Sequence, residues 1–254
     1  MNILVCVKRV PDIGAKIELT PDRQSIVTRN LGFTISPHEE CAVEEAVQLR
    51  ASQGGEATVL ALGPAAAEEQ LRESLARGAD QAMLLETGGE EWDPGQTARA
   101  LVQAIKDRQQ QDKPFDLLLF GNETGDSGDA QVGIRVAHGL GIPCLFGLKG
   151  LEISDGKVIG KREVDSGWEV FEAALPAVIM VKEGINLPHY PSLRGTMKAK
   201  KKKVDKLQPA ISEADLAMQA LENPPEQKKE VQMLGEGPEA APKVVEILKS
   251  LEVL

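Results

Sequence analysis

The sequence predicts an α/β fold in which helices cover both faces of a mostly parallel sheet. Two observations lead to this prediction. Four short, almost wholly apolar runs are typical of strands that are buried on both faces, and segments with helical spacing separate them. Strands and helices that alternate in this way form βαβ units around a parallel sheet.

The predicted elements follow in chain order. The expected strands are Ile3–Val7, Ala57–Leu62, Gln81–Glu86 and Asp116–Gly121. The expected helices are Cys41–Ala51, Ala65–Gly78, Gly95–Gln110 and Ala130–Gly141. Each helical segment places its apolar residues near one stripe, and Gly78 is suited to end the second helix because glycine favours the C-cap.

The pattern of alternating strands and helices ends at Gly141. Residues 148–181 are expected to form added antiparallel strands, and the Asp155-Gly156 pair is typical of a hairpin turn. Residues 182–209 lose all periodicity, which favours a functional loop or an extended arm. We therefore expect an α/β domain over 1–205. Residues 206–254 would form a linker and an amphipathic C-terminal helix that faces a partner.

Composition excludes several functions. The formal net charge of −10 and the 3% aromatic content argue against nucleic-acid binding. The three cysteines lack any C-x-x-C pair, which is typical of a reducing compartment. Without a signal peptide or a long apolar run, the chain is expected to be cytoplasmic and not inserted in a membrane.

The clearest candidate site is the loop that reads GNETGDSGD from Gly121. Parallel sheets bind ligands beyond the carboxyl ends of their strands. There this loop should meet Cys6–Arg9, Leu60–Pro64 and, as a fourth wall, Thr34–Glu40. The glycines would let the backbone approach a ligand such as a phosphate, yet the loop carries three acids and no lysine. An equally supported alternative is a plain connecting loop in which Asp126 or Asp129 caps the next helix.

Evident catalytic machinery is missing. The chain has neither a P-loop nor a G-x-G-x-x-G after the first strand, and its histidines have no metal-binding spacing. No nucleophile stands beside a base. The basic run Met197–Lys203 is best explained as a solvated or partner-facing segment. The absence of these catalytic motifs favours a carrier or binding subunit with a nucleotide-sized pocket over an enzyme.

A longer segment identifies a resemblance. Residues 160–203, GKREVDSGWEVFEAALPAVIMVKEGINLPHYPSLRGTMKAKKKK, resemble the signature of the electron transfer flavoprotein beta subunit. The segments ILVCVKRVPD, AVEEAVQLR, LGPAAAEEQLRESLARGAD and GNETGDSGDAQVG match that family in order and spacing. The resemblance covers about residues 1–205, and Ser166 is one departure from the usual pattern.

The resemblance implies a Rossmann-like, adenine-nucleotide-binding domain that works in a heterodimer. An alpha subunit would hold most of the redox FAD, and this chain would contribute one wall near the flavin and bury a structural AMP. Electrons would pass from acyl-CoA-type dehydrogenases, as in fatty acid beta-oxidation, to a quinone oxidoreductase.

Family positions transfer to this sequence residue by residue. The implied cofactor contacts are Cys6, Ser36, Pro37, His38, Glu39, Leu62, Gly121, Asn122, Glu123, Thr124, Gly125, Asp126, Ser127, Gly128, Asp129, Ala130, Gln131 and Val132. Among these, His38 takes the position closest to the alpha-bound flavin, where other members have an aromatic residue. Partner docking is implied for a loop over about 181–203, with Leu193 as the apolar anchor beside Pro191 and Arg194.

Two alternatives remain at this point. Bifurcating members of the family bind a second FAD in place of AMP and use NADH, and they carry DGDTAQVG where this chain reads DSGDAQVG. Asp129 then replaces a threonine that would face a diphosphate, and a carboxylate there repels phosphates, which favours AMP. A nucleotide-binding regulatory or stress protein is the other alternative, disfavoured by the docking loop.

Overall fold

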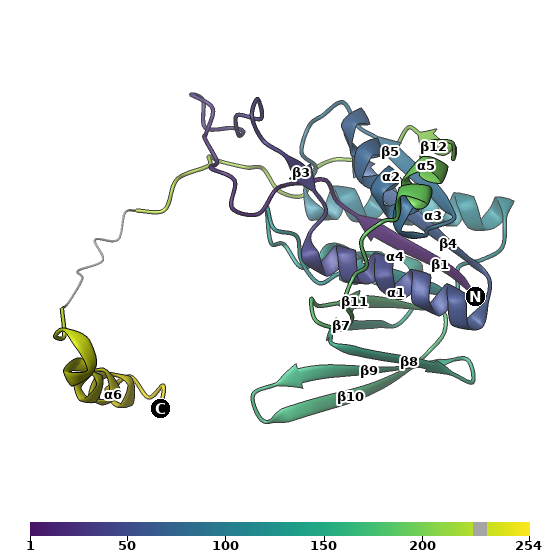
Figure 1. Cartoon of the computed structure of the whole chain (residues 1–254). Coiled ribbons are helices and arrows are strands. Elements are labelled where there is room, and N and C mark those ends of the chain that lie inside the picture. The colour runs from purple at the N-terminus through teal and green to yellow at the C-terminus, as the bar shows by residue number, and fades with distance from the viewer. Residues whose placement is uncertain (226–232) are drawn as a thin grey trace. The chain divides into compact units, whose positions relative to one another are not determined.

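The computed structural model describes residues 1–225 and 233–254 of the chain. It divides into two compact units, Met1–Gln219 and Ala220–Leu254. The first unit holds the α/β fold (Figure 1). The second unit contains a short 3₁₀ turn, η2 (Gly237–Ala240), and the helix α6 (Ala241–Ser250), so the predicted C-terminal helix is present.

A seven-stranded parallel sheet forms the centre of the first unit. Its strand order is β12-β5-β4-β1-β6-β11-β7. The strands are β1 (Asn2–Val7), β4 (Glu56–Gly63), β5 (Gln81–Glu86), β6 (Leu117–Gly121), β7 (Cys144–Leu148), β11 (Ala177–Val181) and β12 (Val204–Leu207). All four predicted strands are therefore confirmed. The chain moves outward from β1 through β4 to β5 and then returns to the other side of β1 as β6. A sheet that reverses direction in this way has a crevice at the carboxyl ends of its central strands.

Helices cover both faces of this sheet, as predicted (Figure 1). They are α1 (Pro37–Gln53), α2 (Glu68–Arg77, after the 3₁₀ turn η1, Ala65–Ala67), α3 (Pro94–Gln111) and α4 (Val132–Leu140). Side chains alternate between the faces along each strand. Ile3 and Val5 accordingly join the core with α1 and α2, whereas Leu4 and Cys6 join the core with α3 and α4.

Two smaller sheets accompany the central sheet. A three-stranded antiparallel sheet consists of β8 (Gly150–Ser154), β9 (Lys157–Val164) and β10 (Gly167–Ala174). The predicted hairpin is confirmed, since Asp155 and Gly156 both have positive φ between β8 and β9. The second sheet is a small ribbon in which β2 (Val10–Pro11) pairs with β3 (Phe33–Thr34).

Two expectations about residues 148–209 were wrong. β11 was expected among the added antiparallel strands, yet it lies between β6 and β7 in the parallel sheet and all of its residues are buried. The segment after β11 contains the helix α5 (Leu193–Ala199) and the edge strand β12, although it shows no periodicity. Both elements gain support from packing, because β12 pairs with β5 and α5 lies against α2.

Residues 208–219 follow β12 and contact α3. Arg99 forms an ion pair of 2.9 Å with Asp215, and the Gln96 side chain donates to the carbonyl of Ser212 at 2.7 Å. Among the described helices, none has the length and apolar character needed to cross a membrane.

Candidate functional site

The first turn of α1 is fixed to the carboxyl end of β1 by one carboxylate. Ser36 caps α1, and its hydroxyl accepts from the Glu39 N–H at 3.3 Å, while Glu39 accepts from the Ser36 N–H at 3.0 Å. This reciprocal capping box orients Glu39 inward. The other Glu39 oxygen accepts the Lys8 N–H at 2.8 Å. Thr34–Glu40 therefore does form a wall beside the end of β1.

Glu39 is an unusual group to find in this position because it is only 4% exposed. Burial raises the pKa of Glu39 to about 8, although hydrogen bonds from the N–H groups of Ser36 and Lys8 oppose that shift. The site consequently holds a carboxyl group whose protonation changes near neutral pH.

Gly121, at the end of β6, lies directly against the same turn. A Cβ at this position would stand 2.7 Å from Glu39 Cγ and 3.1 Å from His38 Cβ, so no side chain fits there. The Ser36 hydroxyl also donates to the carbonyl of Glu123 at 3.2 Å. The glycine loop and α1 thus meet at the crevice that the sheet topology predicts.

The glycine loop contains no lysine of its own, but Lys8, directly after β1, reaches it. The Lys8 ammonium lies 2.5 Å from Asp126 and 2.5 Å from Glu91, which belongs to the loop between β5 and α3. Burial alone would lower the pKa of Lys8, but the two carboxylates outweigh burial and raise it. Burial likewise opposes ionisation of Asp126, yet the Lys8 charge lowers the pKa of this carboxyl. This role of Lys8 was not predicted from the sequence, although Lys8 directly follows the first strand.

The N-terminus of α4 completes the crevice. Gln131 is its N-cap residue, and among the described residues no side chain caps this helix. The alternative in which Asp126 or Asp129 caps α4 is therefore wrong, because Asp126 pairs with Lys8 instead. Uncapped N–H groups at a helix start favour negatively charged ligands.

The backbone before α4 is shaped for a close approach. Gly128 and Ala130 have φ values of 62° and 52°, and Ser127 and Asp129 are exposed. A Cβ on Gly133 would lie 2.9 Å from the Met180 thioether, so this glycine allows the first turn of α4 to rest on β11.

A hollow of about 240 Å³ opens beside the crevice, between α1 and the glycine loop. His38 lies on its wall, and its Nε2 is 3.8 Å from a Glu123 oxygen. Among the described residues, Nδ1 of His38 is buried and has no hydrogen-bond partner. The residues that line the hollow are Ile13, Ser36, Pro37, His38, Glu123, Thr124, Gly125 and Glu183.

Two of the predicted contact residues lie deeper in the fold. Cys6 is buried against α3 and α4, and burial raises the pKa of its thiol, so no reactive thiolate forms there. Leu62 packs beside the same core near the end of β4. Both therefore belong to the apolar core beneath the crevice and present no charged group to it.

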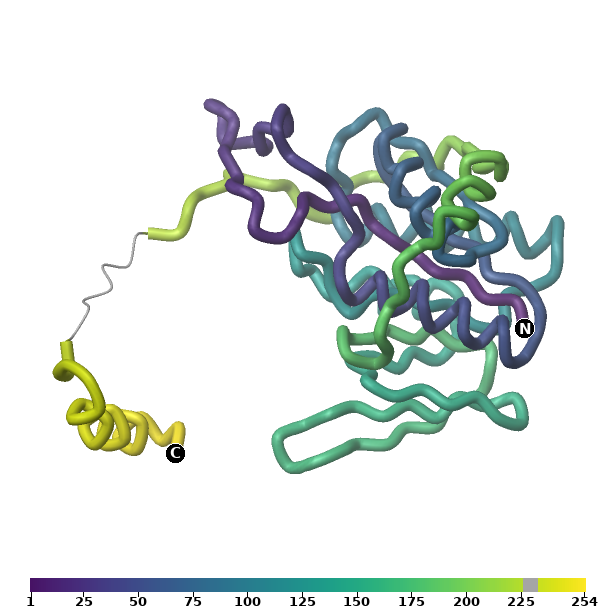
Figure 2. Tube along the Cα trace, in the orientation of Figure 1, coloured from purple at the N-terminus to yellow at the C-terminus, as the bar shows by residue number. Residues whose placement is uncertain are grey.

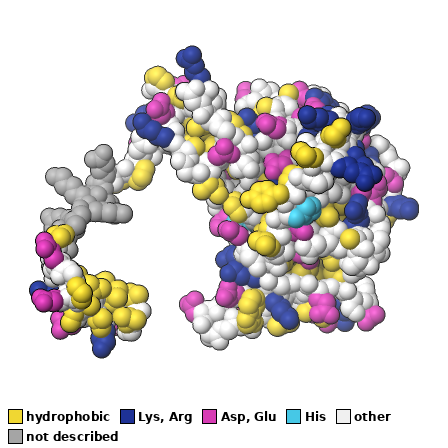
Figure 3. Space-filling view, in the orientation of Figure 1, with side chains coloured by type: hydrophobic (Ala, Val, Ile, Leu, Met, Phe, Trp, Pro, Cys, Tyr) yellow, Lys and Arg dark blue, Asp and Glu magenta, His cyan; other side chains and the backbone are white. Residues whose placement is uncertain are grey.

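The loop predicted to dock a partner carries α5. Ser192 caps that helix, accepting from the Gly195 N–H at 3.0 Å. Leu193 is 88% exposed, with Pro191 and Arg194 on either side. Figure 3 shows Lys and Arg side chains gathered over α5, but the basic run is not a free tail, because Lys202 donates to the carbonyl of Ala79 at 2.6 Å.

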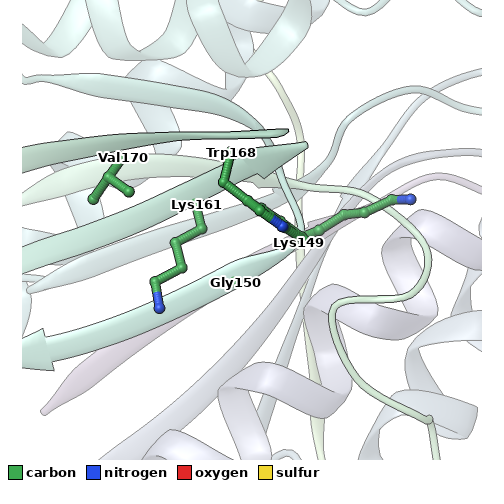
Figure 4. Close-up of a pocket in the computed structure, with 5 residues that line it drawn as sticks. All are labelled: Lys149, Gly150, Lys161, Trp168 and Val170. Carbon is green, nitrogen blue, oxygen red and sulfur yellow. The ribbon is translucent and has the colours of Figure 1, made fainter. Parts of the chain in front are cut away.

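A larger hollow of about 430 Å³ lies elsewhere, on the outer face of β8–β10. Figure 4 shows Trp168, Val170 and the Lys161 side chain over Gly150, with Lys149 extending away from them. None of the converging loops contributes to it. Among the described residues, no group of His, Cys, Asp and Glu side chains is arranged to hold a metal ion.

Comparison with known proteins gives a consistent answer. A family profile described as "Electron transfer flavoprotein domain" matches residues 25–212. The "Electron transfer flavoprotein subunit beta" of Bacillus subtilis is 34% identical over 261 aligned positions, covering 98% of each chain. The subunit of the same name from Syntrophomonas wolfei is 36% identical, over 98% of this chain and 96% of its own. That of Megasphaera elsdenii is 36% identical over 91% and 87%.

Proposed function

The chain belongs to the electron transfer flavoprotein family as one of its beta subunits, and we propose that it is the beta half of a heterodimeric electron carrier. An alpha subunit would hold most of an FAD, which supplies the one- and two-electron chemistry. The carrier would accept electrons from acyl-CoA-type dehydrogenases and deliver them to a quinone oxidoreductase. The chain's own part is to bind, position and dock, so we propose a carrier subunit and not an enzyme.

The crevice at the carboxyl ends of β1 and β6 is our proposed site for a structural AMP. The observation that supports this most strongly is the N-terminus of α4, which follows the glycine loop. No side chain of the described residues caps it, so its N–H groups can bind a monophosphate. Residues of the loop from Gly121 to Val132 would hold the phosphate. Lys8 offsets the charge of Asp126 and so removes one repulsive carboxylate from the site.

We favour AMP over a second FAD because of Asp129. Lys8 is already bound to Asp126 and Glu91, and Asp129 is exposed in the same loop. A second phosphate beside the Asp129 carboxylate would be repelled. The bifurcating alternative, with NADH as donor, requires that this repulsion be avoided.

We propose that the surface around the hollow between α1 and the glycine loop lies closest to the alpha-bound flavin. His38 lies there with a ring nitrogen, Nδ1, that has no partner in the part of the chain that the structure describes, and Ile13 beside it is 73% exposed. The polar imidazole of His38, in place of the aromatic residue of other family members, would change the electrostatic field at the flavin and hence the reduction potential of the flavin.

Nucleotide analysis tests this proposal directly. The chain is co-purified with its alpha partner, the complex is denatured, and the released nucleotides are quantified by chromatography. One FAD and one AMP per heterodimer would support the simple carrier. Two FAD and no AMP would identify the bifurcating alternative, and a complex without flavin would exclude both.

A further inference from the structure

The segment between β11 and α5 exposes two large apolar side chains while two of its polar residues are bonded to α1. Leu187 and Tyr190 are each 91% exposed, whereas Asn186 and His189 bond to Glu45 and Glu44. This is the reverse of the usual distribution in a loop that only connects two elements. Figure 2 shows the segment crossing over α1 before it reaches α5 beside α2.

Buried acids of α1 hold the inner side of this segment. The Glu44 carboxylate accepts the His189 N–H at 3.2 Å and contacts His189 Nδ1 at 2.6 Å. One turn of the same helix offers two more acceptors, since the Asn186 amide donates to the Cys41 carbonyl at 3.0 Å and to Glu45 at 2.9 Å.

Glu44 is built into the helix surface and is not a mobile surface charge. It is 5% exposed, and its second oxygen accepts from the Gln48 side chain at 2.8 Å. Burial alone would raise the pKa of Glu44, but these hydrogen bonds outweigh burial and lower it. A buried, ionised and fully bonded carboxylate has few alternative positions, which fixes the two groups of His189 that bind it.

Arg77 holds the same residue from α2. Its guanidinium donates to the His189 carbonyl at 3.2 Å and is itself fixed by Glu40 at 2.7 Å and Glu73 at 2.9 Å. Arg77 is 6% exposed. His189 is thus bound through its N–H, its ring and its carbonyl by two helices, immediately before Tyr190 and Leu193.

We infer that Glu44 and Arg77 are positioning residues that preorganise the docking loop, so that its apolar side chains are presented in one conformation. The inference rests on the docking role proposed for this loop. Its physical basis is that a loop ordered before contact loses less conformational entropy on binding a partner. Without these bonds the exposed apolar side chains would sample many positions.

Two variants of the full complex test the inference. Glu44→Ala removes the anchor on α1, and alanine keeps the helix propensity high. Asn186→Ala removes a loop anchor without altering any helix. Asp107→Ala is the matched control, because Asp107 accepts from a glutamine one turn away on α3, as Glu44 does on α1, but binds no residue of the loop. Hydrogen–deuterium exchange of residues 185–193 is measured together with kcat and KM for a cognate acyl-CoA dehydrogenase.

We expect exchange in 185–193 to become about tenfold faster in Glu44→Ala and Asn186→Ala, since each loses bonds to a buried or charged partner. KM for the dehydrogenase should rise while kcat, flavin content and nucleotide content stay constant, and Asp107→Ala should resemble the unaltered complex. Unchanged exchange in both variants would overturn the inference, whatever the docking rate.

The kinetic arm separates this inference from the docking proposal itself. Faster exchange with unchanged KM would overturn the inference if Leu193→Ala still raises KM, because disorder of the loop would then not matter. If Leu193→Ala also leaves KM unchanged, the docking role fails, whereas the faster exchange still supports the anchoring by Glu44.

Discussion

Lys8 is the residue on which the charge balance of the crevice depends, because its ammonium bridges Asp126 and Glu91. Lys8→Met should leave two carboxylates without a counter-charge and release the glycine loop. We expect nucleotide affinity to fall about tenfold or more, since breaking a partly buried, hydrogen-bonded charge pair costs about 1.5–3 kcal/mol. Equilibrium dialysis of the complex against labelled AMP measures this change.

Lys16→Met is the control for that experiment. Lys16 is 89% exposed and pairs only loosely with Glu18 at 3.5 Å. Equal affinities in the two variants would show that Lys8 contributes nothing beyond its general charge.

Glu39 gives the site a pH dependence. Its pKa is raised from 4.5 to about 8, so the folded protein holds a proton that the unfolded chain has lost over this range. Stability from this group is fully present below pH 4.5 and declines as pH rises toward 8. We expect the unfolding free energy, relative to Glu39→Gln, to fall by at most about 1.4 kcal/mol per pH unit in this window. Urea unfolding of both proteins across the window measures it, and parallel profiles would contradict the raised pKa.

At the residue scale, the sequence predicted short-range geometry better than long-range contacts. The turn containing Ser36 and Glu39 was predicted beside the glycine loop, and the structure brings both against Gly121. Lys8 was missed because its partner Glu91 lies 83 residues away, and one sequence does not show which loop a flexible lysine reaches. Whether these residues bind a nucleotide stays a prediction.

At the element scale, α4 must lie close to the sheet for its N-terminus to face the crevice. In Gly133→Ala the new Cβ would meet Met180 at 2.9 Å and Phe120 at 3.2 Å, so these side chains or the first turn of α4 must shift. We expect lower AMP affinity by several-fold and a loss of about 1–3 kcal/mol in stability, which is typical of overpacking. Calorimetric titration and thermal unfolding measure the two effects.

Gly88→Ala is a suitable comparison for Gly133→Ala. No atom lies within 4 Å of a Cβ built on Gly88, and it is not among the glycines with positive φ. If both variants bind AMP equally well, the position of α4 does not control the site.

Elements with strong periodicity were predicted from the sequence, and those that depend on distant packing were not. β1, β4, β5 and β6 are apolar runs flanked by helices, so local pattern and tertiary position agree. β11 is equally apolar, but it follows an antiparallel hairpin, and its place between β6 and β7 depends on a return across the sheet. β12 has only four residues, which carry no periodic signal, and it exists through its pairing with β5.

At the scale of the whole molecule, exposed apolar side chains mark the surfaces that we expect to contact other proteins. They gather in the docking loop, where Leu187, Tyr190 and Leu193 are about nine-tenths exposed, and on β10, where Trp168 is 56% exposed. In α6, Val244 and Val245 are likewise partly exposed. Partner contact was predicted from the sequence for the docking loop and the C-terminal helix. The exposure of Trp168 on β10 was not predicted, because an apolar residue in a strand pattern is usually assigned to the core.

The docking loop therefore supplies the prediction that concerns the whole carrier. Leu193→Ala should raise KM for a reduced acyl-CoA dehydrogenase about tenfold or more, because truncating an anchor in a partner's pocket typically costs about 2 kcal/mol. Flavin and nucleotide content should not change, since Leu193 is remote from the crevice in sequence and is 88% exposed. Ile211→Ala is the matched control, with an aliphatic side chain in a residue 87% exposed but outside the loop. Stopped-flow reduction of the complex by the dehydrogenase compares the two, and equal rates would mean that the loop's apolar side chains serve some other contact. A slower rate for Leu193→Ala alone would tie electron delivery to this one side chain, held outward by the bonds that His189 makes to α1 and α2.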